Sequence, residues 1–225
     1  MTETLSLRAK IEQSPMGAYQ WMIVVMAAIM NLLDGFDVLA LAFTATAIRG
    51  EFGLTGIELG YLLSAGLFGM TAGSLFLAPL ADKIGRRPLL LMAVSLSAIG
   101  MLGSAFISQY QWLGFWRVIT GLGVGGILVG TNVITSEYSS RKWRSFAISV
   151  YAAGFGIGAV LGGMFAVMLQ GEYGWRSVFL AGAILTSLLL VVLFIWLPES
   201  IDFLTSKQPK NAEVRLNLIA KKIGL

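Results

Sequence analysis

The feature that most constrains the fold is a series of six long apolar runs, joined by short segments that carry charged or turn-forming residues. A helix needs about 20 residues to cross a hydrocarbon core of about 30 Å. The expected spans are residues 19–48, 60–81, 89–107, 112–136, 145–169 and 178–197. The sequence therefore predicts an all-α membrane protein, with residues 1–18 before a six-helix transmembrane bundle at 19–197 and a polar tail at 198–225.

The composition agrees with this class of protein and excludes several kinds of chemistry. Hydrophobic residues make up 56% of the chain and charged residues 12%, and the 27 glycines are typical of helices that pack closely in lipid. The chain has no Cys, which excludes disulfides, Cys-bound zinc and thiol catalysis. Because no nucleophile constellation, metal site or nucleotide-binding loop is recognisable, we expect no enzyme activity, no metal and no cofactor.

The distribution of Lys and Arg predicts the orientation in the membrane. All but three of the 16 basic residues fall before the first span, in the second and fourth connections or in the tail, and the exceptions are Arg49, Arg117 and Arg176. Cytoplasmic segments carry the excess of Lys and Arg, so both termini are expected on the cytoplasmic side of a cell inner membrane. Since the basic residues are dispersed at the ends of spans, nucleic acid is not an expected partner.

Two carboxylates stand in the middle of the first span. Asp34 and Asp37 are three residues apart, and Asn31 lies one turn earlier, so the three share one face of a helix. Asp34 is 15 residues into the expected span, or about 22 Å along it, toward its outer side. A carboxylate at this depth is costly unless it is paired, protonated or beside water. These residues are therefore expected to line a cavity on a proton or substrate pathway.

The same carboxylates suggest where a proton is carried. The chain has no His, so a group that titrates near neutral pH must be a perturbed carboxylate. Two neighbouring carboxylates in a desolvated site cannot both ionise at low cost, so one is expected to hold a proton. Arg117 has two open interpretations: it attracts a substrate carboxylate or modulates the aspartates, or it extends to the outer interface.

The connection between spans two and three carries a recognisable motif. Residues 78–87, here called the signature loop, read Ala-Pro-Leu-Ala-Asp-Lys-Ile-Gly-Arg-Arg. This resembles the G-x-x-x-D-[RK]-x-G-R-[RK] loop of the major facilitator superfamily, with Ala78 in place of the first Gly. The rule that cytoplasmic loops are basic explains the three cations, but it does not explain Asp82 and Gly85 at their fixed spacing.

Three further elements match that superfamily in chain order. Residues 113–125 are similar to its L-x-x-x-R-x-x-Q-G-x-G element with Thr for Gln, Glu137 and Arg144 resemble its E-x-x-P-x-x-x-R-G element without the Pro and Gly, and residues 198–200 read Pro-Glu-Ser. The resemblance implies a cytoplasmic gate in which the signature loop contacts a facing helix end and the loop after span four. The expected gating residues are Asp82, Arg86, Arg87, Glu137, Arg141 and Arg144.

Residues 34–37 narrow the resemblance. They read Asp-Gly-Phe-Asp, similar to the D-G-[YF]-D signature in the first helix of the aromatic acid:proton symporters. This implies proton-coupled import of an aromatic or related organic acid, with Asn31, Asp34, Asp37 and Arg117 as proton- and substrate-binding residues. A proton taken from outside would neutralise the aspartates and reduce their repulsion of an anionic substrate. The alternative is that both acids are structural.

Two other functions stay open. Residues 154–163 are close to the antiporter motif G-x-x-x-G-P-x-x-G-G, but Ala159 replaces the Pro, so a proton-driven exporter is disfavoured. Close helix packing through small residues is the favoured explanation for these glycines. A membrane interaction module that does not transport, or a truncated half, is the other alternative.

The resemblance covers only half of the superfamily architecture. Complete members have two six-helix halves, each with two inverted three-helix repeats, and a substrate site between the halves. This chain matches the N-terminal half, with residues 198–225 corresponding to the linker between halves. We therefore expect a second six-helix partner, most simply another copy in a homodimer, because a lone bundle would expose Asp34 and Asp37 to lipid.

Overall fold

The computed structural model describes the backbone of residues 2–224 and the side chains of residues 7–224. Within this part the chain forms nine helices: α1 (Thr2–Gln13), α2 (Ala18–Phe52), α3 (Gly56–Ile84), α4 (Arg86–Ala105), α5 (Tyr110–Tyr138), α6 (Arg144–Tyr173), α7 (Trp175–Trp196), α8 (Ile201–Lys207) and α9 (Ala212–Ile223).

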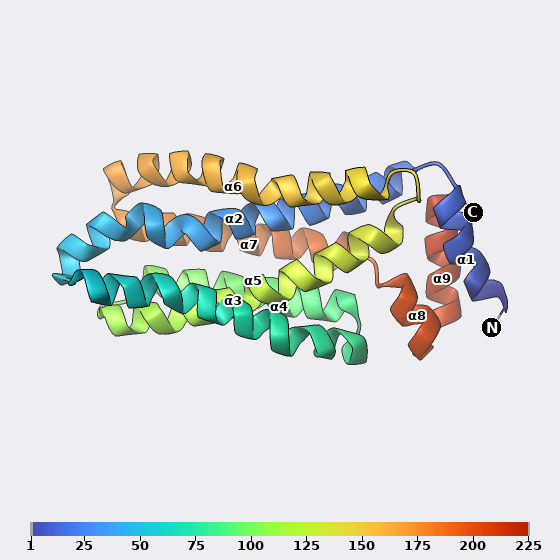
Figure 1. Cartoon of the computed structure of the whole chain (residues 1–225), viewed down its shortest axis with the longest axis horizontal. Coiled ribbons are helices and arrows are strands. Elements are labelled where there is room, and N and C mark those ends of the chain that lie inside the picture. The colour runs from blue at the N-terminus through green and yellow to red at the C-terminus, as the bar shows by residue number, and fades with distance from the viewer. Residues whose placement is uncertain (1, 225) are drawn as a thin grey trace.

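Six of these helices form an elongated bundle, and the short helices α1, α8 and α9 lie across one end of it (Figure 1). Helices α2 to α7 are each long and apolar enough to cross a membrane, which confirms the six expected spans. Their ends differ from the expected ones by a few residues. For example, α2 continues to Phe52 because the left-handed residue that ends it is Gly53, whose N–H donates to the carbonyl of Arg49.

The segment after the bundle is not the simple polar tail that its composition indicated. The side chain of Ser200 accepts a hydrogen bond from the N–H of Phe203 (3.1 Å) and so caps α8. Leu204 of α8 and Leu216 of α9 are buried in one apolar cluster with Ile11 of α1. In this segment apolar residues recur at helical spacing among charged ones, so each helix has an apolar side that can pack. The mean composition of the segment is polar and does not reveal that side.

The packing of the bundle follows two repeats of three helices. The first comprises α2, α3 and α4, and the second comprises α5, α6 and α7. The most extensive contacts join the first helix of each repeat to the second helix of the other, α2 with α6 and α5 with α3. The two repeats therefore interlock, as expected for one half of the superfamily fold.

Glycines set the distance between the interlocked helices. A Cβ atom at Gly125 of α5 would lie 2.6 Å from the backbone nitrogen of Ser74 of α3. At the equivalent contact, a Cβ at Gly158 of α6 would collide with the backbone of Leu32 of α2. The backbones meet directly at both crossings, which is the close approach that small residues permit in membrane helices.

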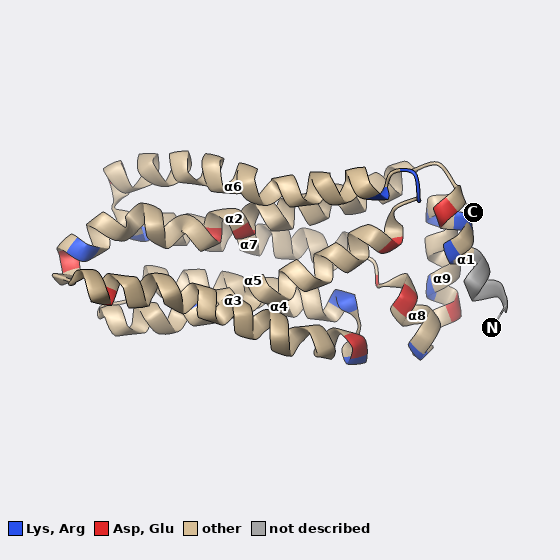
Figure 2. Ribbon diagram, viewed as in Figure 1, with Lys and Arg blue, Asp and Glu red and all other residues tan. Residues whose placement is uncertain are grey.

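Charged residues gather near the two ends of the bundle, with few between them (Figure 2). At the end away from α1, the Glu51 carboxylate accepts hydrogen bonds from Trp175 Nε1 (2.7 Å) and from Arg176 Nη1 and Nη2 (2.9 and 2.7 Å). This group fastens the end of α2 to the start of α7. The bundle thus has charged residues near both ends and a largely apolar middle.

The α2–α6 crossing yields a stability prediction with a matched control. Gly158→Ala places a methyl group against the Leu32 backbone, so it should lower the free energy of unfolding by about 1–3 kcal/mol through overpacking. Gly156→Ala on the same helix should leave stability nearly unchanged, because no atom lies within 4 Å of its added Cβ. The midpoints of thermal unfolding in one detergent provide the comparison. Equal midpoints for the two variants would show that the crossing is not tightly packed.

Candidate functional site

The three polar residues that the sequence singled out at the centre of α2 lie inside the bundle. Asn31, Asp34 and Asp37 are 3%, 2% and 1% exposed, and they occupy successive turns of the helix. Asp34 is the 17th of the 35 residues of α2, so it lies at the middle of the helix. The Asp pair is therefore buried in the middle of a long apolar helix, where a charge is costly unless it is paired, protonated or beside water.

Asp37 points toward α4 and α5. Its Oδ2 accepts a hydrogen bond of 2.6 Å from the hydroxyl of Ser97, and both residues are buried. Its Oδ1 is buried without a hydrogen-bond partner among the described residues. The nearest cation is Arg117, which donates from Nη1 to the backbone carbonyl of Asp37 at 3.1 Å. The carboxylate is therefore close to a guanidinium without forming a direct ion pair with it in the described part of the chain.

Arg117 is held on several sides within the bundle and is only 3% exposed. Its Nη2 donates to the hydroxyl of Thr120 and contacts the sulfur of Met101, both at 2.9 Å. Its guanidinium lies 5.0 Å from the centre of the Phe179 ring. The interpretation in which Arg117 extends to the outer interface is therefore wrong, and proximity to Asp37 favours the other one.

Asn31 and Asp34 face a second set of groups. The Asn31 side chain donates to the backbone carbonyl of Tyr151 on α6 at 2.8 Å, and Asn31 Oδ1 and Asp34 Oδ2 have no hydrogen-bond partner among the described residues. The Tyr151 hydroxyl accepts from Thr131 of α5 at 3.3 Å. The polar residues of α2 thus belong to two neighbouring clusters, one shared with α4 and α5 and one with α5 and α6.

The expectation that a lone bundle exposes Asp34 and Asp37 to lipid is wrong. Successive residues turn by about 100° around a helix axis, and the open side of α2 is the one that carries Val25 and Ile29. Asp34 lies opposite that side and faces the interior of the bundle, where it is buried. Next to Asp34 in the chain, Gly35 allows α2 and α6 to pack closely, since a Cβ there would lie 2.9 Å from the carbonyl carbon of Phe155.

A small cavity reaches the Asp37 side of the site from between α2, α3 and α5. Its volume is about 30 Å³, which is room for one or two water molecules. Its polar lining comes from Asp37, Arg117 and Thr120, and the rest consists of apolar side chains and the glycines Gly66 and Gly121. A hydrated path to a buried carboxylate is therefore compatible with the packing of this half.

The expected gating residues lie at the end of the bundle that carries α1, α8 and α9, and within this chain the signature loop has partners other than the loop after α5. In the signature loop, Asp82 pairs with Arg86 at 2.6 Å. The backbone N–H of Arg87 donates to Glu199 at 3.0 Å, and its guanidinium donates to the carbonyl of Phe194 at 2.6 Å. Within the described residues, the loop is thus tied to the end of α7 and not to the loop after α5.

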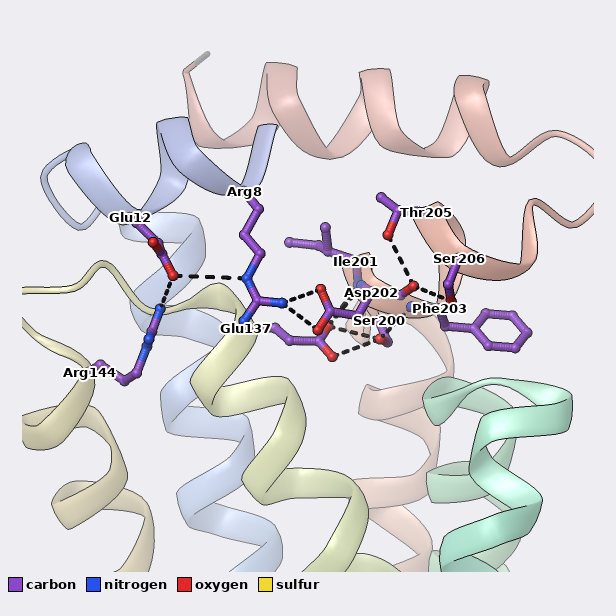
Figure 3. A network of polar contacts seen from close by, with 10 residues as sticks. All are labelled: Arg8, Glu12, Glu137, Arg144, Ser200, Ile201, Asp202, Phe203, Thr205 and Ser206. Carbon is purple, nitrogen blue, oxygen red and sulfur yellow. Dashed lines mark hydrogen bonds and ion pairs between the residues drawn. The ribbon is translucent and has the colours of Figure 1, made fainter. Parts of the chain in front are cut away.

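The loop after α5 contacts the short helices α1 and α8 (Figure 3). Together with α9, these helices form a layer across this end of the bundle (Figure 1). Glu137 accepts hydrogen bonds from the Ser200 hydroxyl (2.9 and 2.8 Å) and from the N–H of Ile201 (2.8 Å), so it caps α8 from outside. Arg144 pairs with Glu12 of α1 at 2.8 Å. We expected this loop to contact the signature loop. The sequence did not show that α1 and residues 198–225 fold over the loop after α5.

Arg141 and α1 complete the layer. The N–H of Arg141 donates to the backbone carbonyl of Glu12 at 3.0 Å. Arg8 of α1 pairs with Asp202 of α8 at 2.6 Å (Figure 3). The hydrogen bond from Arg144 is the main cause of a lowered pKa for the Glu12 carboxyl. The expected residues did not include Glu12, Arg8, Glu199 or Asp202, since charged groups near the ends of spans carry no distinguishing sequence signal.

The site residues that sequence reasoning missed are Ser97, Met101, Tyr151 and Phe179. Ser97 and Tyr151 are polar groups within apolar spans, and that was the available signal for both. Met101 and Phe179 are indistinguishable from ordinary core residues in the sequence. Only the packing of α4 against α5, and of α7 against α4, brings them to Arg117.

Comparisons with known proteins agree with this geometry. A sequence model described as the Major Facilitator Superfamily matches residues 27–221. A gallate transporter of Pseudomonas putida is 36% identical over 204 residues, covering 91% of this chain and 45% of that protein. A 4-hydroxybenzoate transporter, PcaK, of Pseudomonas putida is 34% identical over 216 residues, covering 96% of this chain and 48% of that protein. The chain thus spans about half the length of these relatives.

The solved structures extend the comparison to the fold. The proton:xylose symporter XylE bound to 6-bromo-6-deoxy-D-glucose superposes with a TM-score of 0.82 at 22% sequence identity. The match covers 92% of this chain and 50% of that one. At this level of identity, the likeness concerns the arrangement of the helices alone.

The layer at the α1 end yields a pH prediction. The folded pKa of Glu12 lies below its ordinary value of 4.5, so its ion pair stabilises α1 fully above that value and is lost as the pH falls through the folded pKa. Amide hydrogen exchange in α1 should therefore accelerate on acidification below about 4.5, beyond the intrinsic change of the exchange rate. Glu12→Gln should show fast exchange already at neutral pH and no further acid step. An acid step that persists in Glu12→Gln would assign the titration to another group.

Proposed function

Because the chain belongs to the major facilitator superfamily, we propose that it forms one half of a secondary active transporter for a small aromatic or related organic acid. The proposal includes proton-coupled import through Asp34 and Asp37 and no enzyme chemistry. It is supported by relatives named as gallate and 4-hydroxybenzoate transporters. It is also supported by the Asp-Gly-Phe-Asp sequence at residues 34–37 on the central turn of α2.

The observation that carries the proposal is the pair of buried carboxyl groups with unpartnered oxygens. Asp34 Oδ2 and Asp37 Oδ1 are both buried without a hydrogen-bond partner among the described residues. A buried polar group without a partner costs about 1–3 kcal/mol, and more if it is charged. A purely structural acid would be expected to have its oxygens satisfied by the surrounding helices. A carboxyl group that gains and loses a proton during a transport cycle is charged, and therefore destabilising, in only part of that cycle.

The environment of the two acids differs in a way that fits a proton cycle. Asp37 has the Ser97 hydroxyl and the nearby Arg117 guanidinium to stabilise its charged form. Asp34 has no such donor at its Oδ2. We assign the resting proton to Asp34 and the exchangeable one to Asp37, which the small cavity reaches. Protonation of Asp37 removes a negative charge from the pathway and so favours entry of an anionic substrate.

The proposed functional unit contains a second six-helix bundle. The chain spans about half of its relatives, and α3 and α6 are the least buried of the six long helices. Both carry exposed apolar residues along their length, among them Phe68 and Phe76 on α3 and Met164 and Met168 on α6. The partner is a second copy or a separate C-terminal half, and residues 198–225 correspond to the linker. Both termini are cytoplasmic in a cell inner membrane.

The proposal predicts the effect of neutralising either acid. Asp34→Asn or Asp37→Asn should abolish proton-driven accumulation of a labelled hydroxybenzoate in proteoliposomes, because neither variant can change its charge at that site. Both variants should fold, since Asn preserves the volume of Asp. Glu172→Gln, at an exposed position near the end of α6, should transport as the unsubstituted chain does. Wild-type accumulation in both Asp variants would remove these residues from the mechanism.

The homodimer has its own test. Superfamily symmetry places the signature loop of one bundle near the start of the second helix in the last repeat of the other. Asp82, whose side chain is 66% exposed, should then approach Ser145 of the other copy, where the N-terminus of α6 favours a carboxylate. With Cys at both positions, oxidation in membranes should give disulfide-linked dimers, and Cys at position 82 combined with Cys at position 172 should not. Monomers alone, or uptake that requires a separate C-terminal half, would contradict the homodimer.

A further inference from the structure

Ser97 differs from the other serines of α4 in the target of its hydroxyl. Ser95 and Ser104 donate to backbone carbonyls of their own helix, at Leu91 and Gly100. The Ser97 hydroxyl instead leaves its helix and donates to Oδ2 of Asp37 on α2 at 2.6 Å. Both Ser97 and Ser104 are fully buried. The contact is therefore specific to Ser97 and does not reflect the general behaviour of serine in a membrane helix.

Packing holds Ser97 in place for this contact. A Cβ at Gly123 of α5 would lie 2.7 Å from the backbone nitrogen of Ser97 and 3.1 Å from its Cβ. The α4 backbone therefore rests directly against α5 at this point. On the other side of the carboxylate, a Cβ at Gly182 of α7 would lie 3.4 Å from Asp37 Oδ1. Met101 and Phe36 fill the space beside Gly182, because the same Cβ would collide with Met101 Cε and lie 2.9 Å from Phe36 Cε1. Oδ1 thus faces apolar groups, with no hydrogen-bond donor to it among the described residues.

Few other groups can influence the charge of Asp37. On its own helix, the titratable neighbour is Asp34, one turn away. From the packed helices, the candidates are Arg117 on α5 and Tyr151 on α6, while α3, α4 and α7 contribute apolar side chains, glycines and the Ser97 hydroxyl. Arg117 already uses its Nη atoms on Thr120, Met101 and the Asp37 carbonyl. The direct donor to the carboxylate in the described residues is therefore Ser97.

We propose that Ser97 is a positioning residue for proton exchange at Asp37, holding Oδ2 so that Oδ1 is the oxygen that takes and releases the proton. This inference rests on the proposed function. Uptake moves a proton from water to Oδ1 and converts the carboxylate to a neutral carboxyl, and release returns that proton to water. Burial alone disfavours the charged carboxylate. A charge-assisted hydrogen bond to Oδ2 stabilises it, which makes release possible inside an apolar bundle.

The test is an infrared titration of the 225-residue chain in nanodiscs. The carboxyl stretch of Asp37 is identified as the band that Asp37→Asn removes, in an Asp34→Asn background that leaves one acid in the site. Ser97→Ala should move the midpoint of this band to higher pH by about one unit, or about tenfold in proton affinity. Ser97→Thr, which keeps the hydroxyl, should restore the original midpoint. Ser104→Ala is the matched control and should not move it.

A second variant guards against a folding failure. Ser97→Cys keeps nearly the same volume with a much weaker donor, so it should move the midpoint in the same direction as Ser97→Ala. An unchanged midpoint in Ser97→Ala, or in Ser97→Cys if the alanine variant does not fold, would overturn the positioning role. The titration does not depend on transport. Its result can therefore contradict the role of Ser97 without contradicting the proposed function. The proposed function is contradicted if both Asp variants accumulate substrate normally.

Discussion

Hydrocarbon cannot hydrogen-bond to a peptide group, and this constraint governs the rest of the structure. Each segment that crosses the apolar layer must satisfy its backbone internally, so it forms a helix. The six long helices of this chain meet that requirement. Polar side chains within them then have to find partners on other helices, which makes the interior of the bundle the place for Asp34, Asp37 and Arg117.

The interior of the bundle is built around close backbone contacts. Gly35 and Gly158 allow α2 and α6 to touch, and Gly123 allows α4 to rest against α5. The α4–α5 contact holds Ser97 where its hydroxyl reaches Asp37. The same glycines that suggested a transport motif in the sequence therefore have a direct packing role. Precise placement of a buried acid depends on helices that approach without intervening side chains.

The layer formed by α1, α8 and α9 links the ends of several spans. Glu137 caps α8, Glu199 binds the start of α4, and Glu12 of α1 holds the start of α6 through Arg144. Carboxylates are favourable at helix N-termini, where N–H groups lack partners within the helix. A change in the tilt of α6 relative to α5 would strain these contacts. The layer is thus placed to couple the ends of helices from both repeats.

The sequence by itself determined the six spans, the class of fold and the acids and arginine of the site. The length of an apolar run and an isolated charge within it can both be read locally from the sequence. In hydrocarbon, the first predicts a spanning helix and the second predicts a residue that faces the interior of the bundle. The side on which Asp34 and Asp37 lie, the partners of Arg117 and the folding of residues 198–225 were decided only by the tertiary structure. Helical spacing showed that Asn31, Asp34 and Asp37 share a face, but the neighbour of that face depends on the packing of α4, α5 and α6. Ser97 became recognisable only when that packing brought its hydroxyl within 2.6 Å of Asp37.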